Sequence, residues 1–403
     1  MDDALRMQKR YRTVLLLVAL LVMMIISIYQ YSWSLFAYSI QSELGWNLPA
    51  VGLTFTLLTY ASTFIQPFSG WIADLHGPRK VALLAAFLLG IGFILSSSAS
   101  TPGSLSLFYA LGGLGVGILY GVSTAVAIKW FPERRGFATG LVVFGFGAGT
   151  AIFNLIIQAL LESVGLRTTF LYIGVTMLVV TVPSSLLYKY PTDEWISQLG
   201  IDKKRGLKQS TNYKPLDIVK TYQWYLIYFS FSFIVSIVLM FGAQMRMLAQ
   251  EFNLPQEYFN LLLILFPLGN GLSRIAAGAL SDKIGREKIM MIFYIFLGLS
   301  KLGLVNFGHI PVIFLSIAIL AAILGGSPFA LYPALIGDYY GSKYATINYG
   351  ITYTAKAWGG LISGWLSGYL VSQFGSYKLP LIIVALCCLV AAVLSNPKML
   401  KPP

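Results

Sequence analysis

The chain has 403 residues, of which 57% are hydrophobic and only 11% are charged. Soluble domains carry about 25% charged residues, so a mean hydropathy of +0.74 over this length excludes a soluble globular protein, a disordered chain and a secreted disulfide-rich domain. The net charge of +13 does not require a nucleic acid partner, because basic residues of membrane proteins gather on the cytoplasmic face, next to anionic lipid.

The apolar residues fall into many segments rather than one. A membrane-spanning helix needs about 20 mostly apolar residues, and the sequence predicts twelve such helices. Runs such as 14–28 are continuously apolar, whereas strands of a membrane β-barrel alternate in polarity, so we expect an all-α membrane protein. The charged residues 1–12 precede an apolar run that is too long for a cleavable signal peptide. In chain order, the expected spans are residues 13–38, 50–73, 81–100, 104–128, 137–161, 167–188, 224–245, 257–281, 288–307, 311–337, 345–371 and 379–396.

The basic residues predict the orientation in the bilayer. Of the 28 Lys and Arg residues, 22 fall at the termini or in the even-numbered connections, and 3 fall in the odd-numbered ones. This distribution predicts a multi-pass protein of the cell (inner) membrane with both termini in the cytoplasm. The 3 residues on the other side are Arg167, Arg246 and Lys378.

The chain also repeats itself. Gly70-Trp-Ile-Ala-Asp74-Leu-His-Gly77-Pro-Arg79-Lys80 follows the second span, and Gly278-Ala-Leu-Ser-Asp282-Lys-Ile-Gly285-Arg286-Glu-Lys288 follows the eighth, 208 residues later. We therefore expect an N-terminal six-helix bundle over residues 1–190, a cytoplasmic linker over 191–222 and a C-terminal six-helix bundle over 223–403. Two repeated six-helix halves are a transporter architecture, with the substrate held between them near the middle of the membrane.

This repeated loop sequence resembles the motif of the major facilitator superfamily. The resemblance implies twelve helices in two pseudo-symmetric bundles and a monomeric transport unit. Gly70 is expected to let helices approach closely, and Asp74 with Arg79 to form a charge network that holds one conformation closed. The same gating role is expected for the second copy, Asp282 and Arg286, and for Glu133. Ordinary loop charge is the alternative, which the second copy disfavours.

A narrower resemblance covers most of the chain. Lys129-Trp-Phe-Pro-Glu133-Arg-Arg135-Gly-Phe-Ala-Thr-Gly140 is similar to the signature before the fifth helix of monocarboxylate transporters. Gln30-Tyr31-Ser-Trp33, Asn348-Tyr-Gly350 and Ala355-Lys356 are similar to the bacterial oxalate/formate antiporter group. The resemblance implies transport of small organic anions.

Three cations fall inside predicted spans, while no Asp or Glu falls in the middle third of any span: Arg274, Lys301 and Lys356. A charged residue at the centre of a membrane helix costs about 2.5–3.5 kcal/mol on insertion scales. Without a carboxylate at that depth, the expected counter-ion is a bound anion. A guanidinium matches a carboxylate with two parallel hydrogen bonds, so Arg274 is the expected binding residue.

Other residues are expected to support or surround this site. Asn270 lies one helical turn before Arg274, and Lys356 shares a helix face with Tyr353. Lys301, near the end of its helix, is expected to extend its amine to the membrane surface. The aromatic residues expected to wall the site are Tyr31, Tyr120, Phe329, Tyr332 and Tyr353, and the resemblance adds Gln30 and favours Tyr120 and Phe329. The break at Gly325-Gly326-Ser327-Pro328 is expected to kink the tenth span.

Two glycine-rich runs, at 113–117 and 145–149, lie inside apolar spans and are expected to pack helices closely rather than to bind phosphate. The adjacent Cys387 and Cys388, and His76 with His309 in loops, form no metal-binding or catalytic set. We expect no metal, no cofactor and no enzyme activity.

Together these features predict a secondary transporter of small monocarboxylates, of the lactate and pyruvate class, with a proton as the coupling ion. Exchange of oxalate and formate is the alternative in the same class, because two buried cations also suit a dianion. A carboxylate-sensing membrane receptor is an alternative of another class, although a linker of about 33 residues leaves little room for a signalling domain.

Overall fold

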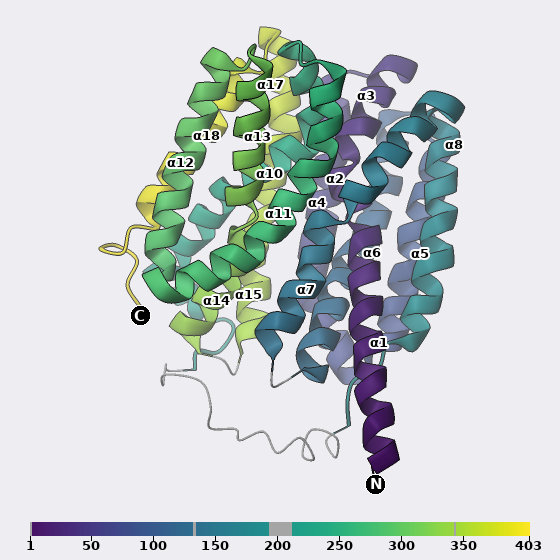
Figure 1. Cartoon of the computed structure of the whole chain (residues 1–403), viewed down its shortest axis with the longest axis vertical. Coiled ribbons are helices and arrows are strands. Elements are labelled where there is room, and N and C mark those ends of the chain that lie inside the picture. Colours follow the sequence, from purple (N-terminus) through teal and green to yellow (C-terminus); the bar gives the residue numbers. More distant parts are fainter. Residues whose placement is uncertain (1, 132–133, 193–211, 342–343) are drawn as a thin grey trace.

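The computed structural model describes residues 2–131, 134–192, 212–341 and 344–403, and these residues form an all-helical bundle with its helices along the long axis (Figure 1). In the first part of the chain the helices are α1 (Asp2–Ile26), α2 (Ile28–Tyr31), α3 (Trp33–Leu44), α4 (Leu48–His76), α5 (Pro78–Ser97), α6 (Pro102–Trp130), α7 (Arg135–Ala148) and α8 (Thr150–Leu187). In the second part they are η1 (Ile218–Lys220), α10 (Tyr222–Glu251), α11 (Gln256–Ile284), α12 (Arg286–Phe307), α13 (Pro311–Gly325), α14 (Pro328–Tyr340), α15 (Ala345–Tyr353), α16 (Ala355–Leu361), η2 (Ile362–Leu366), α17 (Ser367–Phe374) and α18 (Lys378–Leu394).

The all-α prediction is confirmed, and each expected span is helical. Nine described stretches are long and apolar enough to cross a membrane. One of them, residues 137–187, holds the fifth and sixth expected spans, which are separated by the non-helical Gly165 at φ 76°. The eleventh span consists of the short helices α15, α16, η2 and α17, and the twelfth, α18, has 17 residues.

Local sequence explains where the helices begin and end. The Asn47 side chain accepts a hydrogen bond from the Ala50 N–H at the start of α4, and Thr101 forms a reciprocal cap with Ser104 at the start of α6, as polar N-cap residues do. The glycines of the two repeated loops end α4 and α11 with positive φ angles, 85° at Gly77 and 103° at Gly285. Such φ angles favour glycine over any side chain with a Cβ.

Four of the predicted spans are interrupted well inside their length. The first span breaks at Ser27 and again at Ser32, the fifth at Gly149, the tenth at Gly326-Ser327 and the eleventh at Thr354. The predicted break in the tenth span is confirmed, whereas the other interruptions were not expected. In membrane helices such irregular backbone is tolerated where it is buried in protein or lines a cavity.

Helices α1–α8 pack mainly on one another, as do α10–α18, and the two groups meet along α3, α4, α7 and α8 on one side and α10, α11, α16, η2 and α17 on the other. We call the end at which α8 finishes and α10 begins the linker end; α1 also begins there (Figure 1). We call the other end the opposite end. The division at residues 190 and 223 remains our proposal, and most of the expected linker, 193–211, lies outside the described residues.

Toward the opposite end, the two groups approach each other through glycine. Gly52 and Gly364 lie so close that a methyl group on either would overlap the backbone of the other. The Thr56 hydroxyl donates to the Gly360 carbonyl and accepts from the Trp365 N–H, both at 3.1 Å. The structure is therefore closed at this end.

The glycine runs within the spans also pack helices, as expected. A methyl group on Gly115 would lie 2.5 Å from the Ala85 carbonyl oxygen, and one on Gly147 would lie 2.7 Å from the Gly271 Cα. Gly70 behaves differently, because a methyl group there would meet nothing within 4 Å. The expected close approach at Gly70 is absent from this conformation.

Candidate functional site

Arg274 lies in the middle of α11 and faces the other group of helices. Its guanidinium is buried, with only 4% of the residue exposed. Nη1 donates to the Val143 carbonyl of α7 at 3.0 Å, and Nη2 donates to the Asn270 Oδ1, one turn earlier on α11, at 3.1 Å. These neutral partners orient the guanidinium without neutralising its charge.

The first span supplies the next contact. Tyr31, in the short helix α2 between the breaks at Ser27 and Ser32, donates from its hydroxyl to Asn270 Oδ1 at 3.1 Å. The Arg274 Nη2 lies 3.4 Å from the same hydroxyl oxygen. Residues from both groups of helices thus meet at one guanidinium.

Lys356 is the second buried cation of this region, with 3% of the residue exposed. Its Nζ donates to the Tyr353 hydroxyl at 3.3 Å, a long hydrogen bond to a neighbour on the adjoining helix α15. The Arg274 Cζ and the Lys356 Nζ each lie 5.9 Å from the centre of the Phe146 ring. Among the described residues, no carboxylate pairs with either cation.

Aromatic rings surround the two cations. The Phe329 ring centre lies 4.8 Å from the Arg274 Cζ, within range of a cation–π contact. Tyr120 packs edge-on against Phe146 at 5.1 Å and stacks on Tyr353 at 6.2 Å. The rings exclude water from the cations and so strengthen their attraction for an anion.

Several buried donors of this region have no acceptor within the part of the chain that the structure describes. The unpaired atoms are Nε2 of Gln30, Nδ2 of Asn270 and Nε of Arg274. A buried polar group without a partner costs about 1–3 kcal/mol. All three are N–H groups, so a molecule that satisfies them must supply acceptors, as a carboxylate does.

The structure brings together eight of the nine residues expected to bind substrate, and it separates Tyr332 from them. The Tyr332 hydroxyl donates to Ser230 of α10 at 2.8 Å, and its ring stacks on Phe231 at 4.3 Å. Its polar end therefore lies in the interior of the second group of helices. We correct the expectation that Tyr332 walls the site.

Two contributors to the site were not expected from the sequence. Phe146 touches both cations and packs edge-on against Tyr31 at 5.7 Å. The Val143 contribution is a backbone carbonyl, which carries no sequence signal. Phe146 lies within the glycine run 145–149. A single aromatic residue between glycines was the one feature of the sequence that could have indicated its place in the site.

Comparison with known proteins gives the family. The family model described as Major Facilitator Superfamily matches residues 15–245 and 224–399, which together span nearly the whole chain. The chain belongs to the Major Facilitator Superfamily. Members of this superfamily are transporters rather than enzymes.

Individual relatives of this superfamily member match over most of their length. An "Uncharacterized 38 kDa protein in 23S RNA operon" of Thermoproteus tenax is 35% identical over 94% of this chain and 93% of its own. An "Oxalate:formate antiporter" of Oxalobacter formigenes is 28% identical over 96% of this chain and 92% of its own. A "Monocarboxylate transporter 12-B" of Danio rerio is 23% identical over 85% of this chain and 78% of its own.

The superfamily loop motif forms an ion pair at the linker end, although with an unexpected partner. The Asp74 Oδ1 lies 2.6 Å from the Lys129 Nζ at the end of α6. Among the described residues no ion pair joins Asp74 to Arg79, so the expected charge network between these two residues stays a prediction. The Tyr190 ring covers the same Lys129 amine at 3.7 Å, and its burial, with Asp74 nearby, raises the pKa of the Tyr190 hydroxyl.

The second copy of the motif also forms ion pairs at the linker end. Arg286 lies 3.2 Å from Asp282 and also binds Asp338, near the end of α14. Lys129 and Asp338 both lie near the end of the next but one span, although at the repeat offset of 208 residues Lys129 matches Gly337. Both halves thus tie the motif to the end of the next but one span. Glu133, expected to contribute to gating, lies outside the described residues.

Lys301 was expected to extend its amine to the membrane surface, and this expectation was wrong. The residue is fully buried, and the amine lies 4.5 Å from the centre of the Phe241 ring of α10. Among the residues that the structure describes, its Nζ has no hydrogen-bond partner. Its helix face, rather than its distance from the helix end, decides the outcome, because α12 turns this residue toward α10 and α18. Within the described residues, no group of three or more His, Cys, Asp or Glu could hold a metal ion.

Proposed function

We propose that this protein is a secondary transporter of small carboxylates and that the substrate carboxylate binds Arg274. The observation that carries the proposal is the pair of buried cations, Arg274 and Lys356, which pair with no carboxylate among the described residues. The halves 1–190 and 223–403 would rock about this site. The names of the oxalate:formate antiporter and of the monocarboxylate transporter agree with an anionic substrate.

The geometry explains how an anion would be recognised. The Arg274 guanidinium binds neutral oxygens of Val143, Asn270 and Tyr31, and it keeps one unpaired N–H. A carboxylate that replaces the weak 3.4 Å contact to Tyr31 would form charge-assisted hydrogen bonds, which are about twice as strong as neutral ones. Anion binding also removes the repulsion between the two cations.

Binding would be coupled to movement because both halves contribute to one site. Tyr31 and Val143 belong to the first half, and Arg274 and Lys356 to the second. A carboxylate that touches both sets stabilises the closed arrangement of the halves relative to the empty one. The ligand can shift this equilibrium only by its difference in affinity for the two conformations.

Our first candidate substrates are monocarboxylates of the lactate and pyruvate class, transported with a proton. A specific observation favours the second candidate, which is exchange of oxalate and formate. Lys356 provides a second cation, 5.9 Å from the centre of the same Phe146 ring, and a dianion such as oxalate could engage both. Purified protein in liposomes preloaded with unlabelled oxalate or lactate, with and without a pH gradient, separates the two candidates. Uptake of labelled substrate driven by internal oxalate indicates exchange, whereas lactate uptake that requires the pH gradient indicates proton symport.

The role of Arg274 is tested by Arg274→Lys. The lysine keeps the charge and loses the planar fork, so we expect substrate affinity to fall by about tenfold to a hundredfold, the value of one charged hydrogen bond. Arg246→Lys is the matched control, since Arg246 lies near the end of α10 and donates to Gln256 rather than to a site residue. Wild-type transport by folded Arg274→Lys protein would contradict the proposal.

A further inference from the structure

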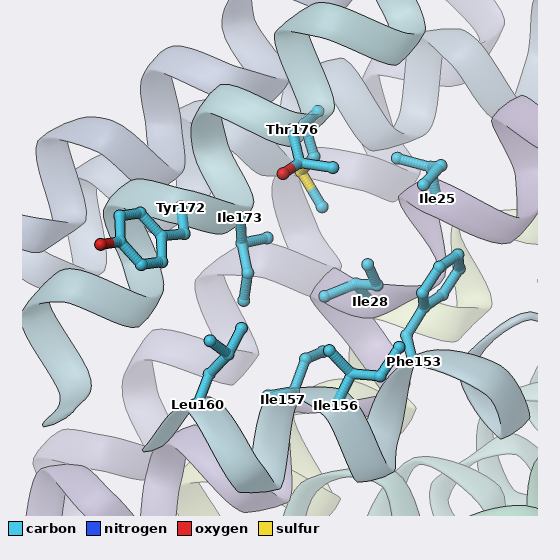
Figure 2. A pocket seen from close by; sticks show the side chains of 10 residues that line it. Ile25, Ile28, Phe153, Ile156, Ile157, Leu160, Tyr172, Ile173 and Thr176 are labelled. Carbon is cyan, nitrogen blue, oxygen red and sulfur yellow. The ribbon is translucent and has the colours of Figure 1, made fainter. Parts of the chain in front are cut away.

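An apolar pocket lies between the first span and the two spans that form α8. None of its lining residues belongs to the proposed substrate site. Its volume is about 110 Å³, and its wall is almost entirely apolar (Figure 2). The lining residues are Ile25, Ile28, Phe153, Ile156, Ile157, Leu160, Tyr172, Ile173, Thr176 and Met177.

The pocket has a buried floor and an exposed rim. Ile157, Ile173 and Met177 are buried, whereas Ile156 is 55% and Tyr172 48% exposed. The rim belongs to stretches apolar enough to cross a membrane, so in a bilayer it faces lipid tails. An apolar cavity of about 150 Å³ stays dry and takes up molecules such as benzene, and a pocket of comparable size open to lipid would take up hydrocarbon.

Charged residues at the end of this surface indicate which lipid headgroup would bind beside the pocket. Arg167 precedes Tyr172 on α8 by a distance of about 7.5 Å along a helix, and Glu162 follows Leu160 just before the bend at Gly165. Both side chains are exposed. Glu162 accepts a hydrogen bond from Gln158 at 3.1 Å, and the nearby Glu43 accepts one from the Leu166 N–H at 3.3 Å. One cation and one carboxylate beside an apolar pocket match a headgroup that carries a phosphate and an ammonium.

We propose that this pocket binds one acyl chain of a zwitterionic phospholipid, with the phosphate at Arg167 and the ammonium at Glu162. The site has a consequence for the first span, because Ile25 and Ile28 flank the break at Ser27. The bound chain packs behind the short helix α2, which carries Gln30 and Tyr31. The acyl chain would thereby support α2 from the side that faces the lipid.

Photo-crosslinking of the purified full chain tests the proposal. The probes are phosphatidylethanolamine and phosphatidylglycerol, each with a diazirine on an acyl chain, and the crosslinked peptides are mapped by mass spectrometry. Thr176→Trp fills the pocket from its rim, and Ile156→Trp is a second filling variant. Val179→Trp is the matched control, since Val179 is 67% exposed on the same helix and does not line the pocket.

We expect phosphatidylethanolamine to label the lining peptides of the wild type and of Val179→Trp equally. Labelling in the filled variants should fall roughly tenfold, the loss expected from about two methylene groups that are no longer buried. Glu162→Gln should remove the preference for phosphatidylethanolamine over phosphatidylglycerol, and Arg167→Gln should weaken labelling by both lipids. Equal labelling of the filled variants and the wild type, or labelling spread evenly over exposed residues, would overturn the acyl-chain site. Equal labelling of the wild type by both lipids would overturn the headgroup assignment. The readout does not depend on transport.

Discussion

At the scale of single residues, the charge of the site is held by neutral groups. Arg274 binds a carbonyl, an amide oxygen and a hydroxyl, and Lys356 binds only a hydroxyl. An acidic partner would satisfy the cations permanently and leave little for a substrate to gain. Neutral partners fix the geometry and keep the electrostatic attraction available.

The Phe146 ring lies beside both cations, at 5.9 Å from each. We predict that Phe146→Leu weakens substrate binding. Leucine preserves an apolar side chain and removes the ring, and each cation–π contact contributes about 0.5–2 kcal/mol. The ring orients both cations, so we expect the KM for the transported carboxylate to rise by about threefold to thirtyfold. Transport kinetics in liposomes measure this, with the lipid-facing Phe229→Leu as control. An unchanged KM would show that the ring only fills space.

Lys301 differs from Arg274 and Lys356. It is a buried cation outside the proposed substrate site. Its recorded contact is the Phe241 ring, and removing an ammonium from water costs several kcal/mol. We predict that Lys301→Met leaves the thermal unfolding midpoint in detergent unchanged or raises it. The exposed Lys378→Met serves as control. A marked loss of both stability and transport in Lys301→Met would show that the amine has a function.

At the scale of helices, apolar length predicted the spans well and predicted their interruptions poorly. The break after Gly325 could be predicted because glycine and proline stand together there. The breaks at Ser27, Ser32 and Thr354 could not, since a single Ser or Thr inside an apolar run carries no helix-breaking signal of its own. Packing of the two halves decides them. The same limit explains Lys301, whose helix face depends on tertiary contacts.

The glycine contact between α4 and η2 leads to a prediction at this scale. A methyl group at Gly364 would lie 2.6 Å from the Gly52 carbonyl oxygen and 2.6 Å from the Thr56 hydroxyl oxygen. We therefore expect Gly364→Ala to destabilise this closed arrangement by about 1–3 kcal/mol, the usual cost of overpacking. Gly337→Ala, where a methyl group meets nothing within 4 Å, is the control.

Thiol labelling detects the change. Thr63 is buried two turns beyond Thr56 on the same face of α4. In the background of Thr63→Cys, a membrane-impermeant maleimide applied from the opposite end should react faster when Gly364→Ala is also present. Equal rates would mean that the glycine contact does not hold this end closed.

At the scale of the whole molecule, the duplication was visible in the sequence, and the ion pairs within it were not. The repeated loops mark equivalent positions, but Asp74 selects Lys129 and Arg286 selects Asp338. The two pairs lie at similar places in the two halves but not at equivalent repeat positions. Asp74 and Arg286 are 212 residues apart and Lys129 and Asp338 are 209 apart, whereas the repeat offset is 208 residues, so the repeat alone could not predict these pairs. Exposed pairs contribute only about 0–1 kcal/mol each, so we propose that they affect the choice of conformation rather than stability.

The distribution of basic residues predicts how the protein is oriented in the membrane. In the structure, Arg167, Arg246 and Lys378 lie at the opposite end, while Arg286 and Lys129 lie at the linker end. The strong excess of basic residues at the linker end predicts that this end faces the cytoplasm. Exposed positions at each end, Glu257 and Lys398, allow a direct test. In a chain whose Cys387 and Cys388 are replaced by serine, Glu257→Cys should react with an impermeant maleimide in intact cells, and Lys398→Cys should react only after lysis. The reverse pattern would place the linker end outside, and every assignment of a cytoplasmic face would have to be inverted.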